Sequence, residues 1–138
     1  MMLSENATLE EVQSYFRGDD FAYDVTGCRI VEASRGHSVA ELQLDPKKHY
    51  NAMGGVMGGA IFTLADYALA VCSNYNEPPS VSVSHTIEFL SGAKGDKLIA
   101  TCDVDKSGRT LGFYAVVVTD NTGRKIAKMT ATCFRTQV

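Results

Sequence analysis

The hydrophobic residues near the N-terminus recur at helical spacing. Leu9, Val12 and Phe16 follow one another at intervals of three or four positions. They come after residues 8–11, Thr-Leu-Glu-Glu, which have the S/T-x-x-E form of a capping box. Together these signals predict one short amphipathic helix that ends near Gly18.

The next segment, residues 23–44, has strand character. Residues 38–44 alternate cleanly between two faces, and residues 35–37, Arg-Gly-His, can turn the chain. We therefore predict a hairpin of two strands, which ends at the Asp-Pro pair of residues 45 and 46.

A long apolar segment occupies the middle of the chain. Residues 60–75 follow a glycine-rich stretch at 54–59, and Asp66 is the one charged residue between Val56 and Cys72. The segment is shorter than the roughly 20 apolar residues of a membrane span, and its charge is central. It therefore predicts a buried helix that packs closely on a sheet through its alanines and ends before two prolines.

The rest of the chain has the period of β-strands. Four segments follow this pattern, at residues 81–89, 98–104, 111–119 and 125–135. Short turns between them imply antiparallel pairing. The sum is two strands, one long buried helix and four strands. This order predicts an α+β fold in a single domain over residues 1–138, with residues 1–20 as an N-terminal helical extension.

The composition is typical of a folded domain that does not bind nucleic acid. The chain has 138 residues, of which 45% are hydrophobic and 21% charged, and its net charge is −3. Its four cysteines and three histidines are scattered, which argues against a metal site, and no cofactor is expected. Isolated thiols and an N-terminus without a signal-peptide pattern predict a cytoplasmic protein that does not associate with membranes.

Asp66 is the strongest candidate for chemistry. An ionised carboxylate in an apolar helix costs several kcal/mol unless it is paired or neutralised, and no Lys, Arg or His lies within a helical turn or two. Unexplained buried carboxylates are enriched at active sites. The alternatives are a hydrogen bond to Thr63 or exposure to water. His85, on the apolar face of its strand, is interpreted as a satisfied core histidine.

The glycines at the start of the predicted helix are a second candidate. The N–H groups of Gly58 and Gly59 have no partner inside a helix and lie at the positive end of its dipole. Without side chains, these residues let a substrate oxygen approach closely. This arrangement favours an anion site or an oxyanion hole. The alternative is a flexible turn or a close helix–sheet contact.

The motif His49-x-Asn51-x-x-Gly54-x-x-x-Gly58-Gly59-x-x-x-Thr63-Leu64-x-Asp66 resembles the signature of hotdog-fold acyl-CoA thioesterases. The similarity is greatest to the phenylacetic-acid-degradation-type branch. The resemblance implies a long central helix wrapped by a curved antiparallel sheet of about six strands. It also implies homodimers, which often pair into homotetramers, and hydrolysis of an acyl-CoA thioester.

The resemblance also implies roles for individual residues. Asp66 is then the general base or nucleophile, and the Gly58 N–H polarises the thioester carbonyl. Asn51 forms a hydrogen bond near the reacting group, and Ser82 helps to place the water. Further contacts with the substrate are expected from His49, Met57, Gly59 and Arg109.

Met57 stands where the family usually has histidine, and methionine cannot donate a hydrogen bond. Arg109 lies in a turn with other basic residues and is expected to meet the phosphates of CoA.

The spacing of Gly58 and Asp66 bears on the assembly. Eight steps along one helix, at a rise of 1.5 Å per residue, separate them by about 12 Å. One thioester carbonyl cannot meet both at hydrogen-bond range. Two such helices, antiparallel across a two-fold axis, bring Gly58 of one chain towards Asp66 of the other. We therefore expect homodimers with shared active sites, likewise paired as a dimer of dimers.

Two other functions stay open at this point. One is a hotdog-fold hydratase. The active site of such hydratases resembles an Asp-plus-His dyad, although the helix here has no histidine. The other is a catalytically weak acyl-CoA-binding or regulatory module, which Met57 keeps open. Aromatic, short-chain and medium-chain acyl groups are all compatible with the sequence.

Overall fold

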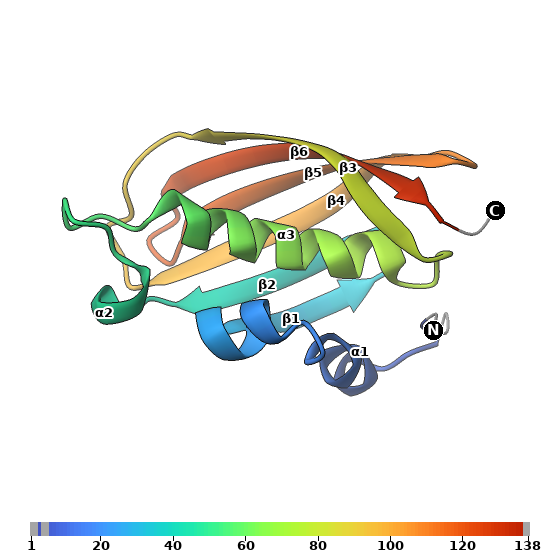
Figure 1. Ribbon diagram of the computed structural model, residues 1–138, viewed down its shortest axis with the longest axis horizontal. Helices are drawn as coiled ribbons and strands as arrows, with labels where there is room; N and C mark the ends of the chain where they lie inside the picture. The colour runs from blue at the N-terminus through green and yellow to red at the C-terminus, as the bar shows by residue number, and fades with distance from the viewer. Residues whose placement is uncertain (1–2, 4–5, 137–138) are drawn as a thin grey trace.

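A six-stranded antiparallel sheet curves around one long helix in the computed structural model of the protein, which describes residue 3 and residues 6–136 (Figure 1). The strand order is β1-β2-β4-β5-β6-β3. This is the hotdog arrangement that the resemblance implies. The elements in chain order are α1 (Leu9–Phe16), the π-helix η1 (Phe21–Thr26), β1 (Cys28–Ser34), β2 (His37–Gln43), α2 (Pro46–His49), α3 (Gly58–Asn74), β3 (Ser80–Phe89), β4 (Lys97–Ser107), β5 (Leu111–Asp120) and β6 (Lys125–Arg135).

The N-terminal helix α1 forms as predicted. The Glu11 N–H donates to the Thr8 hydroxyl at 3.2 Å, and the Thr8 N–H donates to the Glu11 carboxylate at 3.1 Å. These reciprocal bonds satisfy N–H groups that have no partner inside the helix. Val12 and Phe16 are buried, which attaches the amphipathic face of α1 to the core.

The predicted strand over residues 23–34 is wrong in its first part. Residues Phe21–Thr26 form the π-helix η1, and β1 begins only at Cys28. Gly27 ends η1 with a φ of 99°, a left-handed conformation that glycine adopts without strain. The Arg29 guanidinium lies 3.7 Å from the centre of the Tyr23 ring and donates to the Tyr23 carbonyl, so a contact outside the local pattern holds this turn.

Helix α3 lies against the concave face of the sheet, as the predicted buried helix requires (Figure 1). Leu64, Ala65, Ala68 and Val71 are fully buried. The small side chain of Ala68 allows the helix to approach the sheet closely. As a result, the Ser38 hydroxyl on β2 donates directly to the Ala68 carbonyl at 2.5 Å. Within the described chain, no helix is both long and apolar enough to cross a bilayer.

Strand β3 lies at the edge of the sheet and pairs with β6. Its register shifts between Ser82 and Ser84, and such a bulge changes which side chains face inward. Val81 and Val83, expected on the same apolar face as His85, are therefore more than half exposed. Before the shift the even-numbered Ser80 and Ser82 face α3, and after it the odd-numbered His85 and Ile87 do.

Candidate active site

Asp66 lies in the middle of α3, on a part of the helix that the sheet does not cover. Its side chain is 50% exposed, so the prediction of a buried carboxylate is wrong. The uncovered face of the helix opens to cavities of about 340 Å³ and 270 Å³, and Asp66 lines both. A bond from Thr63, one of the alternatives, is also absent, because the Thr63 hydroxyl donates to the Gly59 carbonyl at 2.8 Å.

His85 supplies the basic side chain that the local sequence around Asp66 lacks. Its Nε2 lies 3.7 Å from Oδ1 of Asp66. The prediction of a core histidine without a role is therefore incomplete, since the ring is largely buried but reaches the candidate carboxylate. Partial burial raises the pKa of Asp66, while the nearby His85 lowers it, and the net pKa lies above the usual value.

Asp19 is a second carboxylate at the same place, which the sequence did not single out. It lies between α1 and η1 and lines the 340 Å³ cavity together with Asp66. Burial raises the pKa of Asp19, and the negative charge of Asp66 raises it further. In the sequence, the one available signal for Asp19 was the end of the helical pattern at Phe16. It predicts that the following acidic residues lie in a loop.

The N-terminus of α3 is free of side-chain capping. Met57 is the N-cap residue and makes no capping hydrogen bond. Within the described chain, the N–H groups of Gly58 and Gly59 also have no backbone acceptor. The ring of Phe89 lies against Gly58 and would be 3.0 Å from a Cβ at that position. This helix end therefore offers two unpaired donors beside an aromatic ring.

The loop before α3 is held by Asn51 and His49. The Asn51 side-chain oxygen accepts from the N–H groups of Met53 and Gly55, at 3.0 and 3.1 Å. His49 is buried and accepts at Nδ1 from the Asp45 N–H at 2.9 Å, while its Nε2 donates to the Thr26 carbonyl at 2.7 Å. Both nitrogens of His49 are thus engaged within the chain.

A mostly apolar cavity of about 450 Å³ lies beside this loop. It is lined in part by three of the residues expected to contact substrate, namely His49, Met57 and Gly59. Phe21 and Val25 of η1, both exposed, line the same cavity. The π-helix that the pattern missed therefore shapes this cavity.

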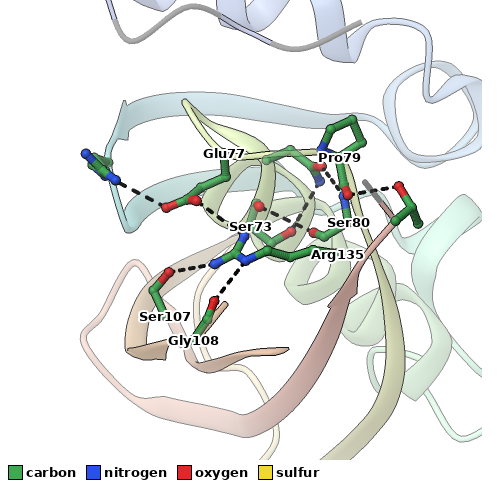
Figure 2. Close-up of polar contacts among 10 residues, drawn as sticks. Ser73, Glu77, Pro79, Ser80, Ser107, Gly108 and Arg135 are labelled. Atoms are coloured by element: carbon green, nitrogen blue, oxygen red, sulfur yellow. Dashed lines mark hydrogen bonds and ion pairs between the residues drawn. The ribbon is translucent and has the colours of Figure 1, made fainter. Parts of the chain in front are cut away.

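Ser82 lines the 270 Å³ cavity together with Asp66, so the structure brings these two candidates together. The beginning of β3 is fixed by polar contacts (Figure 2). The Ser80 N–H donates to Asn74 at 2.9 Å. Glu77, in the preceding loop, pairs with the buried Arg135 at 3.3 Å.

Arg135 connects this loop to the turn between β4 and β5 (Figure 2). It donates to the Gly108 carbonyl at 3.0 Å and to the Ser107 hydroxyl at 2.6 Å. The exposed Arg109 follows in the same turn. Since Ser80 pairs with Arg135, this turn lies at the beginning of β3, whereas Gly58 lies at its other end. Within one chain, Arg109 and Gly58 are therefore not brought together.

Gly58 and Asp66 also open to different cavities of the single chain. Gly58 lines a cavity of about 400 Å³ with Val56, Ile61 and Phe89, whereas Asp66 lines the two cavities described above. Among the residues placed by the structure, no three His, Cys, Asp or Glu side chains gather as a metal site.

Known proteins resemble this chain in sequence and in structure. A family model described as the thioesterase superfamily matches residues 53–127. Human acyl-coenzyme A thioesterase 13 is 32% identical over 132 residues, which cover 92% of this chain and 94% of the human protein. The solved structure of the Escherichia coli PaaI protein, from the phenylacetic acid degradation operon, covers 92% of both chains with a TM-score of 0.84 and 24% identity.

A Streptococcus mutans protein solved with bound acetyl-CoA is also similar. Its TM-score is 0.73 at 30% identity, over 78% of this chain and 86% of the other. The family model covers more than half of this chain, and the human relative matches nearly all of it. The chain therefore belongs to the thioesterase superfamily, in its PaaI-like branch, and is a thioester hydrolase.

Proposed function

We propose that this chain, acting as one domain in the cytoplasm, hydrolyses an acyl-CoA thioester to the free acid and CoA. The observation that carries the proposal is Asp66, a half-exposed carboxylate at two cavities in a helix that begins with two unpaired N–H groups. The names of the human relative and of the acetyl-CoA-bound neighbour support CoA esters as the substrate class.

The proposed reaction assigns one task to each polar group. Asp66 accepts a proton from a water molecule that Ser82 helps to place, and the water oxygen attacks the carbonyl carbon. The carbonyl electrons move to oxygen, where the Gly58 N–H stabilises the negative charge, with Asn51 nearby. The tetrahedral intermediate then expels the CoA thiolate, which takes the proton from Asp66. Direct attack by Asp66 is the alternative first step.

The proposed site combines residues of two chains. Gly58 and Asp66 are about 12 Å apart along one continuous helix and open to different cavities. A two-fold axis that sets two α3 helices antiparallel brings the Gly58 of one copy towards the Asp66 of the other. The exposed Val81 and Val83 on edge strand β3 offer an apolar surface for this pairing. Two such homodimers then pair as a homotetramer.

The remaining substrate contacts follow from position. We assign the acyl side of the substrate to the apolar 450 Å³ cavity that His49, Met57 and Gly59 help to line. Arg109, at the far end of β3, is assigned to the phosphates of CoA in the paired assembly. The proposal involves no metal or other cofactor.

A hydratase is a second candidate because of one observation. The pairing of Asp66 with His85 provides a carboxylate–imidazole dyad, although the histidine comes from β3 and not from the helix. A binding or regulatory module is a third, because Met57 supplies no hydrogen-bond donor at the helix N-terminus. Hydration of a 2-enoyl-CoA would identify the hydratase. Binding of acyl-CoA without turnover would identify the binding module.

The decisive experiment measures thiol release and affinity on one panel of ligands. The panel contains aromatic, short-chain and medium-chain acyl-CoAs and one 2-enoyl-CoA. We expect thiol release by the wild type, and a loss of at least about 10²-fold in Asp66→Asn with binding retained. Wild-type-like turnover in the variant would remove Asp66 from the mechanism. Tight binding without any thiol release contradicts the hydrolase.

A further inference from the structure

The surroundings of His85 define which of its nitrogens carries a proton. Nδ1 lies 3.3 Å from the sulfur of Met129, and the ring is packed edge-on against Phe62, with centroids 5.1 Å apart. A thioether sulfur only accepts hydrogen bonds. A proton on Nδ1 therefore points to Met129 and finds an acceptor there. The side chain is 16% exposed, so the ring has little freedom to turn away.

The other nitrogen, Nε2, faces the Asp66 carboxylate at 3.7 Å. A neutral ring protonated at Nδ1 presents a lone pair to the carboxylate oxygen, which is repulsive. A proton on Nε2 makes the contact favourable, most strongly when the ring is an imidazolium that faces a carboxylate. A neutral ring protonated at Nε2 suits Asp66 alone, so the imidazolium is the one form that turns an N–H to both Met129 and Asp66.

We propose that His85 is a positioning residue which, as an imidazolium, keeps Asp66 ionised and holds its Oδ1, leaving Oδ2 to accept the proton from the attacking water. The kinetic consequence of this inference rests on the proposed function, whereas the pairing of His85 with Asp66 does not.

The reaction balances with His85 unchanged. The water proton moves to Oδ2 of Asp66 as the C–O bond forms, and the carbonyl electron pair moves to oxygen. When the C–S bond breaks, the thiolate takes that proton from Oδ2. The imidazolium keeps both of its protons throughout, so it acts through Asp66 and not on the substrate.

Other titratable groups line the cavities beside the pair. Asp19 and Asp20 line the 340 Å³ cavity with Asp66, as does Tyr67 of α3. Cys133 of β6 lines the 270 Å³ cavity, where β3 adds only the uncharged side chains of Ser80, Val81 and Ser82. The two acidic residues oppose the ionisation of Asp66, since like charges destabilise each other. Within this set, His85 is the group whose charge favours the carboxylate.

The sign of the pH dependence follows directly. An opposite charge within about 4–6 Å lowers a carboxyl pKa by about 1–3 units. The variant His85→Gln is thus expected to move the acidic limb of kcat/KM to higher pH by about one unit. The loss then approaches about 10-fold at pH values below both carboxyl pKa values. It shrinks at higher pH, where Asp66 is ionised in both proteins.

The kinetic test compares His85→Gln with His37→Gln over the full pH range. His37 is a matched control, because its Nδ1 pairs with Asp103 at 2.8 Å on the surface, on strands away from Asp66. We expect an unchanged profile for the control and a mainly kcat-based loss for His85→Gln. A loss of equal size at every pH indicates a purely structural role for His85 and overturns the proposal.

A second measurement needs no turnover. The ring nitrogens of His85 are followed by 15N NMR near pH 6 in the wild type and in Asp66→Asn, with His37 as the internal reference. We expect two protonated nitrogens in the wild type and a neutral Nδ1–H ring in the variant. Identical spectra contradict the pairing even if the enzyme is active. The expected spectra without any thioesterase activity contradict the proposed function instead.

Discussion

The ring of Phe89 occupies the space that a side chain on Gly58 needs. A Cβ at position 58 would lie 3.0 Å from Cζ of Phe89 and 3.3 Å from Cε1. Gly58 also begins α3, where a substrate carbonyl is proposed to approach the helix N–H. A branched residue at this position therefore fills the approach and displaces the ring, so Gly58→Val is a suitable disabling change for a test of shared sites.

Mixing two disabled variants tests whether each site is built from two chains. Asp66→Asn lacks the base, and Gly58→Val blocks the oxyanion donor. The two homodimers should be nearly inactive, but unfolding, mixing equally and refolding makes half of the dimers mixed. Each mixed dimer has one site with both intact residues, so about a quarter of the wild-type activity returns under two-fold symmetry.

The control for this experiment is the mass of the mixed dimer. If each chain holds a complete site, every site keeps one lesion and mixing restores nothing. Activity near zero, with mixed dimers confirmed by mass, therefore contradicts the shared-site model.

Met57→His tests the absent donor at the helix N-terminus. Met57 is exposed at the end of the apolar cavity and makes no capping bond, so an imidazole fits there without disturbing the core. We expect the variant to fold and to raise turnover of an acyl-CoA, because the added N–H shares the developing charge near Gly58. Steady-state kinetics measure this. A large loss of activity in a folded variant shows that methionine is matched to the natural ligand.

Arg109→Gln tests the assignment of the CoA phosphates. The guanidinium is exposed in the β4–β5 turn, and its loss should weaken ground-state binding of the nucleotide. We therefore expect a higher KM for acyl-CoA with little change in kcat. A truncated thioester without the nucleotide serves as the control and should be unaffected. Equal effects on both substrates return Arg109 to an ordinary surface position.

Glu77→Gln tests the ion pair that fixes the beginning of β3. Arg135 is 4% exposed and Glu77 is 14% exposed, so the substitution leaves a buried guanidinium without its countercharge. We expect the free energy of unfolding to fall by about 3 kcal/mol. The matched control is Glu88→Gln, whose pair with Lys128 is exposed on both sides, and its cost should stay below about 1 kcal/mol. Urea unfolding of the three proteins decides, and equal stability of both variants contradicts the prediction.

The sequence predicts the order of elements because each has a local cause. The capping box at Thr8 begins α1, and the apolar run with Pro78 beyond it defines α3. The π-helix has no such local cause, since the stacking of Arg29 on Tyr23 joins two elements. A residue pattern does not encode that contact.

The candidate site was predictable only in part. Asp66 and Ser82 were named from the sequence, and they line one cavity. The exposure of Asp66 was not predictable. The helix has apolar residues on nearly all sides, so its sequence does not show which turn the sheet leaves uncovered. The alternation placed His85 on the inward face of its strand, but its pairing with Asp66 was missed, because the pattern does not tell which residue of α3 lies opposite a given position of β3.

The position of β3 at the sheet edge links assembly to chemistry. Ser82 and His85 lie on a strand with a neighbour on one side only, so half of its backbone N–H and C=O groups are available to another strand. A strand that adds to this edge restrains the same backbone that carries both side chains. In the proposed paired assembly, the rate per chain then varies with protein concentration, and dilution alone lowers the activity of the enzyme.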